Sequence, residues 1–173
     1  MIVLRIIGAA LILFTSMALG NKIASNYRLR PKILQEIETI LEMAASEINY
    51  VATPLPVLLS KLGRRFPKSA GKIFSNLNYY LAQEGCPPDE AIVAARDKLE
   101  SDLPLLEEDW EIIENFTINL GKSDTDEQLR HIELCLSHIR VNQKLALEDR
   151  KKSEKMWRYL GVLTGLLLVI LIW

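Results

Sequence analysis

Apolar residues recur every three or four positions through the middle of the chain, which is the spacing of one face of an α-helix. The stretch 29–51 carries the first such stripe, and the stretch 124–139 begins the last. Between them, prolines and glycines separate one stripe from the next, and no stretch alternates apolar and polar residues as a strand does. The pattern therefore predicts an all-α fold, a six-helix antiparallel bundle with short connections.

Residues around the turns predict where the helices begin and end. Thr53 and Pro54 are expected to cap and start the second helix, and Gly121 has the position of a glycine that follows a helix. Asp124 is expected to cap the last helix, with Glu127 completing a pair similar to a capping box. No helix breaker lies between Asp124 and Gly161, so this helix is predicted to continue into the C-terminal apolar segment. The first and fifth stripes consist of Ile33, Ile37, Ile40, Leu41, Ala44, Ile48, Val51, Leu106, Trp110, Ile113, Phe116 and Leu120.

Both ends of the chain are apolar, and both are predicted to cross a membrane. Residues 2–20 contain one charge, Arg5, and have about the length that a transmembrane helix needs. Residues 156–173 would form a helix about 27 Å long, close to the thickness of the hydrocarbon core. The predicted organisation is an N-terminal anchor at 1–21, a cytosolic bundle at 22–155 and a C-terminal anchor at 156–173.

Basic residues flank both anchors on the side of the bundle. The positive-inside rule therefore places the bundle in the cytosol and both termini outside. The alternative is a secretory signal, with Arg5 before the apolar run and Ala18-Leu19-Gly20 as a cleavage site. This alternative would put the bundle outside the cell, and the sequence leaves open whether the first segment is ever cleaved.

An even number of helices returns the chain to the side on which it started, which sorts the turns into two groups. The turns 64–68 and 101–104 are expected on the membrane side, where basic residues meet anionic headgroups. The turns 52–54, 84–88 and 121–124 are expected at the far end, which is the predicted partner-binding end. The predicted membrane-interface residues are Lys22, Arg28, Arg30, Arg64, Arg65, Lys68, Arg150, Lys151, Lys152, Lys155, Trp157, Arg158 and Tyr159. The predicted partner-binding residues are Thr53, Pro54, Glu84, Gly85, Gly121, Lys122 and Asp124.

A pair of glycines in the second apolar segment predicts close helix packing in the membrane. Gly161 and Gly165 are spaced as GxxxG, which lets two helix backbones approach each other. The expected packing partner is the N-terminal helix or another subunit.

Charge and cysteine usage exclude some classes of protein. The chain has 21 Lys+Arg against 22 Asp+Glu, and no basic patch indicates nucleic-acid binding. Cys86 and Cys135 are too few for a disulfide scaffold and are expected to be free thiols in a cytosolic domain. The carboxylates in 107–111 cluster at the start of a predicted helix, where the helix dipole favours them.

No motif for catalysis or phosphate binding is present, so we predict neither enzymatic activity nor a cofactor. His131, Cys135 and His138 fall within about 60° of one another on the last helix. His131 and Cys135 have a spacing that suits zinc. The two histidines are, however, about 10 Å apart along the helix. We therefore expect these residues to pack at the edge of the buried face and regard them as weak metal candidates.

Several segments resemble the stage III sporulation protein AB family. The C-terminal stretch Lys155–Leu163 with Gly165–Ile170 looks like the end of that family's chains, and Arg30-Pro31 after the first anchor is similar too. The segments Glu47-Ile48-Asn49-Tyr50, Thr53-Pro54-Leu55-Pro56 and Leu120–Asp124 with Gln128 fit as well. The resemblance extends over the whole chain.

That family in turn resembles the cytosolic domain of the type II secretion inner-membrane platform protein, a six-helix antiparallel bundle. Thr53-Pro54-Leu55-Pro56 matches the proline-containing turn of that domain, and Glu84-Gly85 with Glu90-Ala91 matches its glycine and glutamate-alanine pattern. Gly121 falls near its later glycine pair, although the form Gly-Glu-x-x-Gly is missing.

The resemblance implies a role in endospore formation. It implies an integral protein of the mother-cell membrane facing the forespore, which links a cytosolic ATPase to a secretion-like channel. The partners implied are channel proteins and the neighbouring AAA-type or secretion-type ATPase, and the oligomeric state stays open. The alternative from another class is a signal-cleaved, extracytoplasmic metal-binding or sensory bundle with a single anchor.

Overall fold

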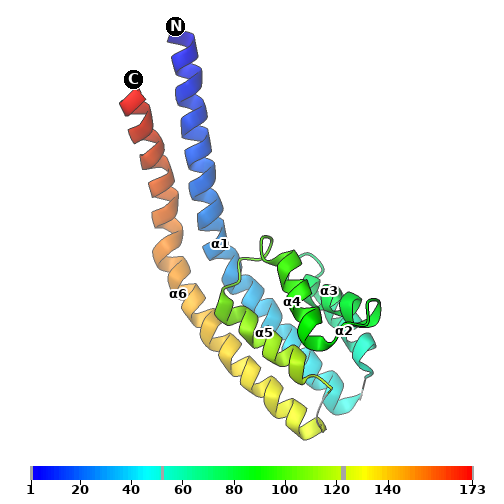
Figure 1. Ribbon diagram of the computed structural model, residues 1–173. Coiled ribbons are helices and arrows are strands. Elements are labelled where there is room, and N and C mark those ends of the chain that lie inside the picture. The colour runs from blue at the N-terminus through cyan, green and yellow to red at the C-terminus, as the bar shows by residue number, and fades with distance from the viewer. Residues whose placement is uncertain (1, 52, 122–123, 173) are drawn as a thin grey trace. The chain divides into compact units, whose positions relative to one another are not determined.

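The computed structural model describes residues 2–51, 53–121 and 124–172, and helices make up most of them. Figure 1 shows the helices in chain order. They are α1 (Ile2–Tyr50), α2 (Leu55–Arg65), α3 (Gly71–Ala82), α4 (Pro88–Leu99), α5 (Glu107–Asn119) and α6 (Thr125–Ile172). None of the described residues forms a strand. The predicted all-α class with six helices is confirmed.

The first and last helices are longer than the predicted elements. α1 runs through Pro31 without a break, so the N-terminal anchor and the first helix of the bundle form one helix. α6 is also continuous from Thr125 to Ile172, as the lack of a breaker predicted. Within the described part of the chain, one helix, α1, contains a stretch long and apolar enough to cross a membrane. The predicted second anchor ends at Trp173, which lies outside the described residues, and it stays a prediction.

The chain divides into two compact units. Unit 1 combines Met1–Leu29 with Leu145–Trp173, and unit 2 is Arg30–Lys144. These boundaries differ from the predicted ones at 21 and 155, which followed the ends of the apolar segments. The two helices of unit 1 stay together beyond those ends, since Ala24 and Ala146 are both buried.

Unit 2 is a helical bundle with an apolar core. The predicted stripes supply much of this core, including Ile37, Ile40 and Trp110, which are almost fully buried. The rings of Phe74 and Phe116 meet edge to face, with their centroids 6.2 Å apart. Edge-to-face contact is the favoured geometry for aromatic pairs, and it ties α3 to α5.

For two residues the prediction of a place in the core is wrong. Val51 is 61% exposed and Leu106 is 50% exposed. Val51 comes after the last residue of α1, and Leu106 comes before the first residue of α5. Helical periodicity does not apply to residues outside a helix, so neither side chain is carried to the buried face.

The predicted helix ends in the tip region are close to the observed ones. Gly121 follows α5 with φ of 78°, in the left-handed region that glycine adopts without strain. Asp124 Oδ1 accepts a hydrogen bond from the Glu127 backbone N–H at 2.9 Å, as expected for a helix N-cap. Pro54 is the residue that caps α2, which begins at Leu55, one position later than predicted.

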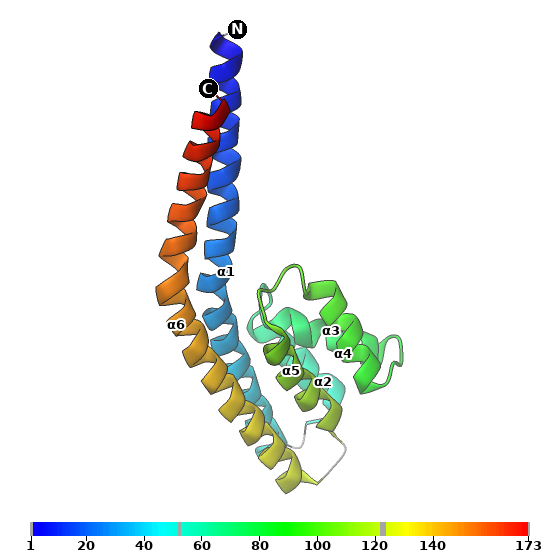
Figure 2. The ribbon, with the colours of Figure 1, turned by 60° about the vertical axis from the view of Figure 1, so that its left-hand side comes forward.

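Unit 2 has two distinct ends. We call the end near Arg30 and Lys144, where α1 enters and α6 leaves, the entry end. The opposite end, where α1 finishes at Tyr50 and α6 starts at Thr125, is the tip. A helix from Arg30 to Tyr50 spans about 30 Å, which separates the two ends. Figure 2 shows the end of α1 and the start of α6 at the tip.

The α4–α5 and α2–α3 connections lie at the entry end. Asp109, at the start of α5, is paired with Arg30. Lys72, at the start of α3, is 3.3 Å from Asp102 in the α4–α5 connection. For these four connections the arrangement within unit 2 matches the predicted grouping, and the place of 84–88 at the tip stays a prediction.

Candidate functional site

The two helices of unit 1 form a hairpin through small residues. Ser16 Oγ donates a hydrogen bond to the Gly161 carbonyl oxygen at 2.6 Å and lies 3.0 Å from Thr164 Oγ1. In both ribbon views the C-terminal part of α6 runs beside the N-terminal part of α1. A polar contact between helices is favourable inside a bilayer, where water cannot satisfy the hydroxyl group.

Glycines bring the two backbones into direct contact. A Cβ placed on Gly161 would lie 2.9 Å from Gly20 Cα and 3.0 Å from the Ser16 carbonyl oxygen. A Cβ on Gly165 would lie 3.1 Å from Leu13 Cδ2. Backbone atoms cannot move aside as a flexible side chain can, so the pairing of Gly20 with Gly161 requires glycine on both helices. The GxxxG pair thus faces the N-terminal helix of the same chain.

Charged residues continue the hairpin beyond its apolar part. Glu154 accepts hydrogen bonds from Arg150 at 3.0 Å and from Arg158 at 3.4 Å, each one turn away on α6. The hydrogen bond from Arg150 and the charges of Arg150, Arg158 and Arg28 lower the pKa of the Glu154 carboxyl. Glu154 therefore stays ionised among the basic residues and offsets part of their mutual repulsion.

The structure separates the predicted membrane-interface residues into three groups. Those of unit 1 lie on exposed or half-buried surfaces; they are Lys22, Arg28, Arg150, Lys151, Lys152, Lys155, Trp157, Arg158 and Tyr159. Arg64, Arg65 and Lys68 are exposed in and beside the α2–α3 connection of unit 2. Arg30 is different, because it is 8% exposed and paired with the buried Asp109. Arg30 therefore differs from the other predicted interface residues, because its charge is paired inside the bundle.

The tip of unit 2 is fixed by a polar contact between α1 and α2. Glu47 accepts hydrogen bonds from Thr53 Oγ1 at 2.5 Å and from Lys61 Nζ at 2.8 Å. These bonds, with that from Lys61 the strongest, lower the pKa of Glu47. The α1–α2 connection is thereby held against both helices that it joins.

The α5–α6 connection lies next to the α1–α2 connection. A Cβ on Gly121 would be 3.9 Å from Leu55 Cδ2, at the first residue of α2. The Gly121 N–H donates to Gln128 Oε1 at 3.3 Å, which holds the turn against α6. The structure thus places the predicted residue Gly121 beside the start of α2, which Thr53 and Pro54 directly precede. Lys122, also predicted for this surface, lies outside the described residues.

The third predicted connection, between α3 and α4, stands apart. Gly85 has φ of 68°, and a Cβ placed there would have no atom within 4 Å. Glu84 accepts a hydrogen bond from the Tyr79 hydroxyl, which raises the pKa of Tyr79. Glu84 and Gly85 are therefore ordered by α3 itself and not by the other two connections.

The tip also exposes large apolar side chains that sequence analysis missed. Tyr50 is 82% exposed, Val51 is 61% exposed and Val57 is 49% exposed. All three belong to the segment 50–57 around the α1–α2 connection. The available signal was Thr53-Pro54, which marks the break between α1 and α2, because helical periodicity does not carry side chains at such a break to the core.

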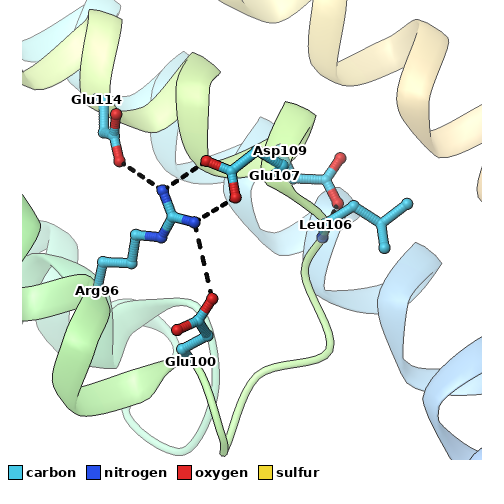
Figure 3. A network of polar contacts seen from close by, with 6 residues as sticks. All are labelled: Arg96, Glu100, Leu106, Glu107, Asp109 and Glu114. Atoms are coloured by element: carbon cyan, nitrogen blue, oxygen red, sulfur yellow. Dashed lines mark hydrogen bonds and ion pairs between the residues drawn. The ribbon is translucent and has the colours of Figure 1, made fainter.

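A network of charges centred on Arg96 joins α4 to α5 in unit 2. Figure 3 shows its guanidinium among three carboxylates, those of Glu100, Glu107 and Glu114. The hydrogen bond from Arg96 lowers the pKa of Glu107. The Arg96 guanidinium also lies 5.9 Å from the centre of the Trp110 ring, within the range of a cation–π contact. The ion pair with Arg96 therefore gives Glu107 a structural role.

The weak metal candidates do not assemble into a ligand set. Among the residues that the structure describes, no group of three or more His, Cys, Asp or Glu side chains could hold a metal ion. Cys135 is buried and its thiol lies 3.8 Å from the Ile112 carbonyl oxygen. Burial raises the pKa of Cys135, so the thiol stays protonated. His138 is exposed, and His131 lines a small hollow with Phe116 and Ile132.

Comparison with known proteins matches nearly the whole chain. The family model described as stage III sporulation protein AB covers residues 5–173. The stage III sporulation protein AB of Bacillus subtilis (strain 168) is 28% identical over 169 residues, which are 98% of this chain and 99% of that protein. A solved structure of stage III sporulation protein AB has a TM-score of 0.63 at 23% identity and covers 70% of this chain and 96% of its own. At that identity the likeness to the solved structure concerns the fold.

Proposed function

Since this chain belongs to the stage III sporulation protein AB family, we propose that it is a non-enzymatic membrane platform of the channel needed for endospore formation. In this proposal, the hairpin of unit 1 holds the protein in the mother-cell membrane that faces the forespore. Unit 2 lies in the cytosol and binds the ATPase that drives the assembly or action of the channel. The termini lie on the other side of the membrane.

The observation that carries the proposal is the surface at the tip of unit 2. Hydrogen bonds hold the described parts of its two connections in place. Glu47 binds Thr53 in the first connection, and Gln128 binds Gly121 in the second. Beside them, Tyr50, Val51 and Val57 expose apolar surface on ordered backbone. Apolar and aromatic side chains on a rigid frame are typical of protein-binding surfaces. The tip is also the end of unit 2 opposite to the one where α1 and α6 enter.

Unit 1 supports an uncleaved anchor in preference to a cleaved signal. A signal cleaved after Gly20 would remove Ser16 and Gly20, the residues that contact Gly161. The C-terminal segment would then lose its packing partner within the chain. The hairpin therefore favours the platform over an extracytoplasmic bundle with a single anchor.

The test is capture of the neighbouring ATPase by the full chain in detergent-solubilised membranes of sporulating cells. The double variant Tyr50→Ser with Val51→Ser is expected to reduce capture several-fold. Asp124→Ser, which removes the charge and keeps a capping oxygen, tests the second connection without unfolding the start of α6.

The matched control is Val93→Ser. Val93 is 50% exposed on α4 and resembles Val51 in chemistry, but it belongs to another surface of unit 2. Exposed substitutions of this kind change stability little, so capture by the control is expected to equal that of the wild type. Equal capture by the tip variants and the wild type would overturn the assignment of the tip.

A further inference from the structure

One face of α6 in unit 2 carries a second apolar stripe that nothing in unit 2 covers. Leu134 is 58% exposed and Val141 is 54% exposed, one heptad apart. His138 lies between them, and the spacing of 134, 138 and 141 is that of alternating d, a and d positions of a coiled coil. The buried side chains of α6, such as Ile132 and Ile139, point to the opposite face. The helix therefore has one stripe for its own core and another for an external partner.

The two edges of this exposed stripe differ in charge. On one edge lies α5, as the contacts of Cys135 with Ile112 and of Asn142 with Asp109 show. Glu108 and Glu111 of α5 line an open groove of about 400 Å³ together with His138 and Val141. On the other edge, helical geometry places Arg130, Ser137 and Lys144 of α6. One edge is thus acidic and the other basic.

These charges have no partner within the described part of the chain. Glu108, Glu111, Arg130 and Lys144 are all exposed, and none makes an ion pair with another described residue. Asp109 is hydrogen-bonded to Asn142, so Glu108 and Lys144 lie at nearly the same height along α6, on opposite sides of the stripe. A surface with opposite charges at equal height on its two edges is complementary to itself.

We infer that a second copy of this chain covers the stripe, in a parallel pair related by a two-fold axis along α6. A parallel pair places Leu134 and Val141 against their own counterparts. The two-fold axis brings the basic edge of each copy to the acidic α5 edge of the other, so that Lys144 faces Glu108. Two copies anchored in one membrane share one orientation, which a two-fold axis normal to the membrane preserves, and in this respect the inference rests on the proposed function. Confinement in a membrane raises the effective concentration, so a short stripe suffices.

Cysteine cross-linking in membranes tests the arrangement directly. In the full chain with Cys86→Ser and Cys135→Ala, Val141→Cys is expected to give a disulfide-linked homodimer on mild oxidation, because a parallel two-fold pair brings each Val141 to its counterpart. The matched control is Glu133→Cys, which is exposed on the same helix but lies about 100° around it from Leu134, outside the stripe. It is expected to stay monomeric.

Exchanging the charges of Lys144 and Glu108 then tests whether the basic edge of one copy meets the acidic edge of the other. Lys144→Glu is expected to reduce the Val141→Cys dimer several-fold, and adding Glu108→Lys is expected to restore it. Equal cross-linking at positions 133 and 141, cross-linking of Val141→Cys only to a different protein, or no dimer would each overturn the inference. Membrane fractionation of the same samples separates this failure from failure of the anchor, since a monomer that stays in the membrane leaves the platform proposal standing.

Discussion

Arg30 and Asp109 form a bidentate ion pair inside unit 2. Arg30 Nε donates to Asp109 Oδ2 at 2.8 Å, and Arg30 Nη2 donates to Oδ1 at 3.1 Å. Asp109 also accepts from Asn142 Nδ2 at 2.8 Å and from the Leu106 backbone N–H at 2.9 Å. One fully buried carboxylate therefore joins α1 and α6 and caps α5. Together these contacts give both carboxylate oxygens of Asp109 hydrogen-bond partners. A buried charge is tolerated when it is paired and hydrogen-bonded in this way.

Removing the carboxylate is expected to destabilise the protein strongly. Asp109→Ala removes the buried carboxylate that pairs with the Arg30 guanidinium, and breaking a buried pair in this way costs about 3–5 kcal/mol. Thermal unfolding of the full chain in detergent, followed by circular dichroism, measures the loss. The control Asp97→Ala removes an exposed carboxylate of α4 and is expected to unfold near the wild-type temperature. Equal melting temperatures for the two variants would contradict this role of the pair.

Replacing both members of the pair is expected to recover part of this stability. The double variant Arg30→Met with Asp109→Leu removes both charges and fills the space with apolar groups, which buried ion pairs often tolerate. The Leu106 N–H and Asn142 would still lose an acceptor, so we expect incomplete recovery. A double variant that is no more stable than Asp109→Ala would show that the capping and Asn142 bonds matter more than charge balance.

The contact between Gly20 and Gly161 predicts a specific sensitivity of the hairpin of unit 1. The pair Ser16→Cys with Thr164→Cys replaces two oxygens that lie 3.0 Å apart and is expected to form an intramolecular disulfide. Adding Gly161→Leu is expected to abolish this disulfide, because its side chain would overlap the α1 backbone. Gel mobility with and without reductant measures the result.

The control for this experiment is Gly8→Leu. Gly8 also lies in the apolar part of α1, but a Cβ there meets no atom within 4 Å. Its disulfide yield is expected to match that of the parent pair. The same disulfide reports on processing, since a chain cleaved after Gly20 has no residue 16 to cross-link. A parent pair that never cross-links in membranes would contradict the hairpin.

The sequence predicted the helices well because their signals are local. Gly121, Asp124 and the spacing of Ile37, Ile40 and Trp110 depend on residues within one or two turns of the chain. The missing breaker between Asp124 and Gly161 likewise predicted one long helix.

The candidate sites were harder to predict because they depend on contacts between distant segments. Arg30 stands beside basic residues in the sequence, and only the fold reveals that Asp109 lies opposite it. Val51 has the spacing of a core residue, yet α1 ends just before it. The second stripe on α6 has no clear signal in the sequence, because His138 interrupts the apolar positions Leu134 and Val141.

Cysteine labelling of intact cells tests the topology. Cys86 is half-buried in the α3–α4 connection, and Cys135 is buried. A membrane-impermeant maleimide is therefore expected to leave intact sporulating cells unlabelled and to label Cys86 after the membrane is permeabilised. Cys86→Ser is the control for specificity. Labelling of Cys86 in intact cells would place unit 2 outside and support the extracytoplasmic alternative.

The Arg96 network predicts a pH dependence of stability. The hydrogen bond from Arg96 holds the pKa of Glu107 below its ordinary value of 4.5. The folded state therefore binds this proton less readily than the unfolded state, so the stabilisation is present above pH 4.5 and is lost as the pH falls below it. Glu107→Gln, which cannot ionise, is expected to melt below the wild type at pH 7.

The two melting curves are expected to converge as the pH falls below 4.5, because the wild-type carboxyl then becomes protonated as well. The control is Glu133→Gln, an exposed carboxyl of α6 that makes no ion pair with a described residue. It is expected to follow the wild type over the whole range. A constant difference between Glu107→Gln and the wild type at every pH would show that Glu107 acts through packing and not through its charge.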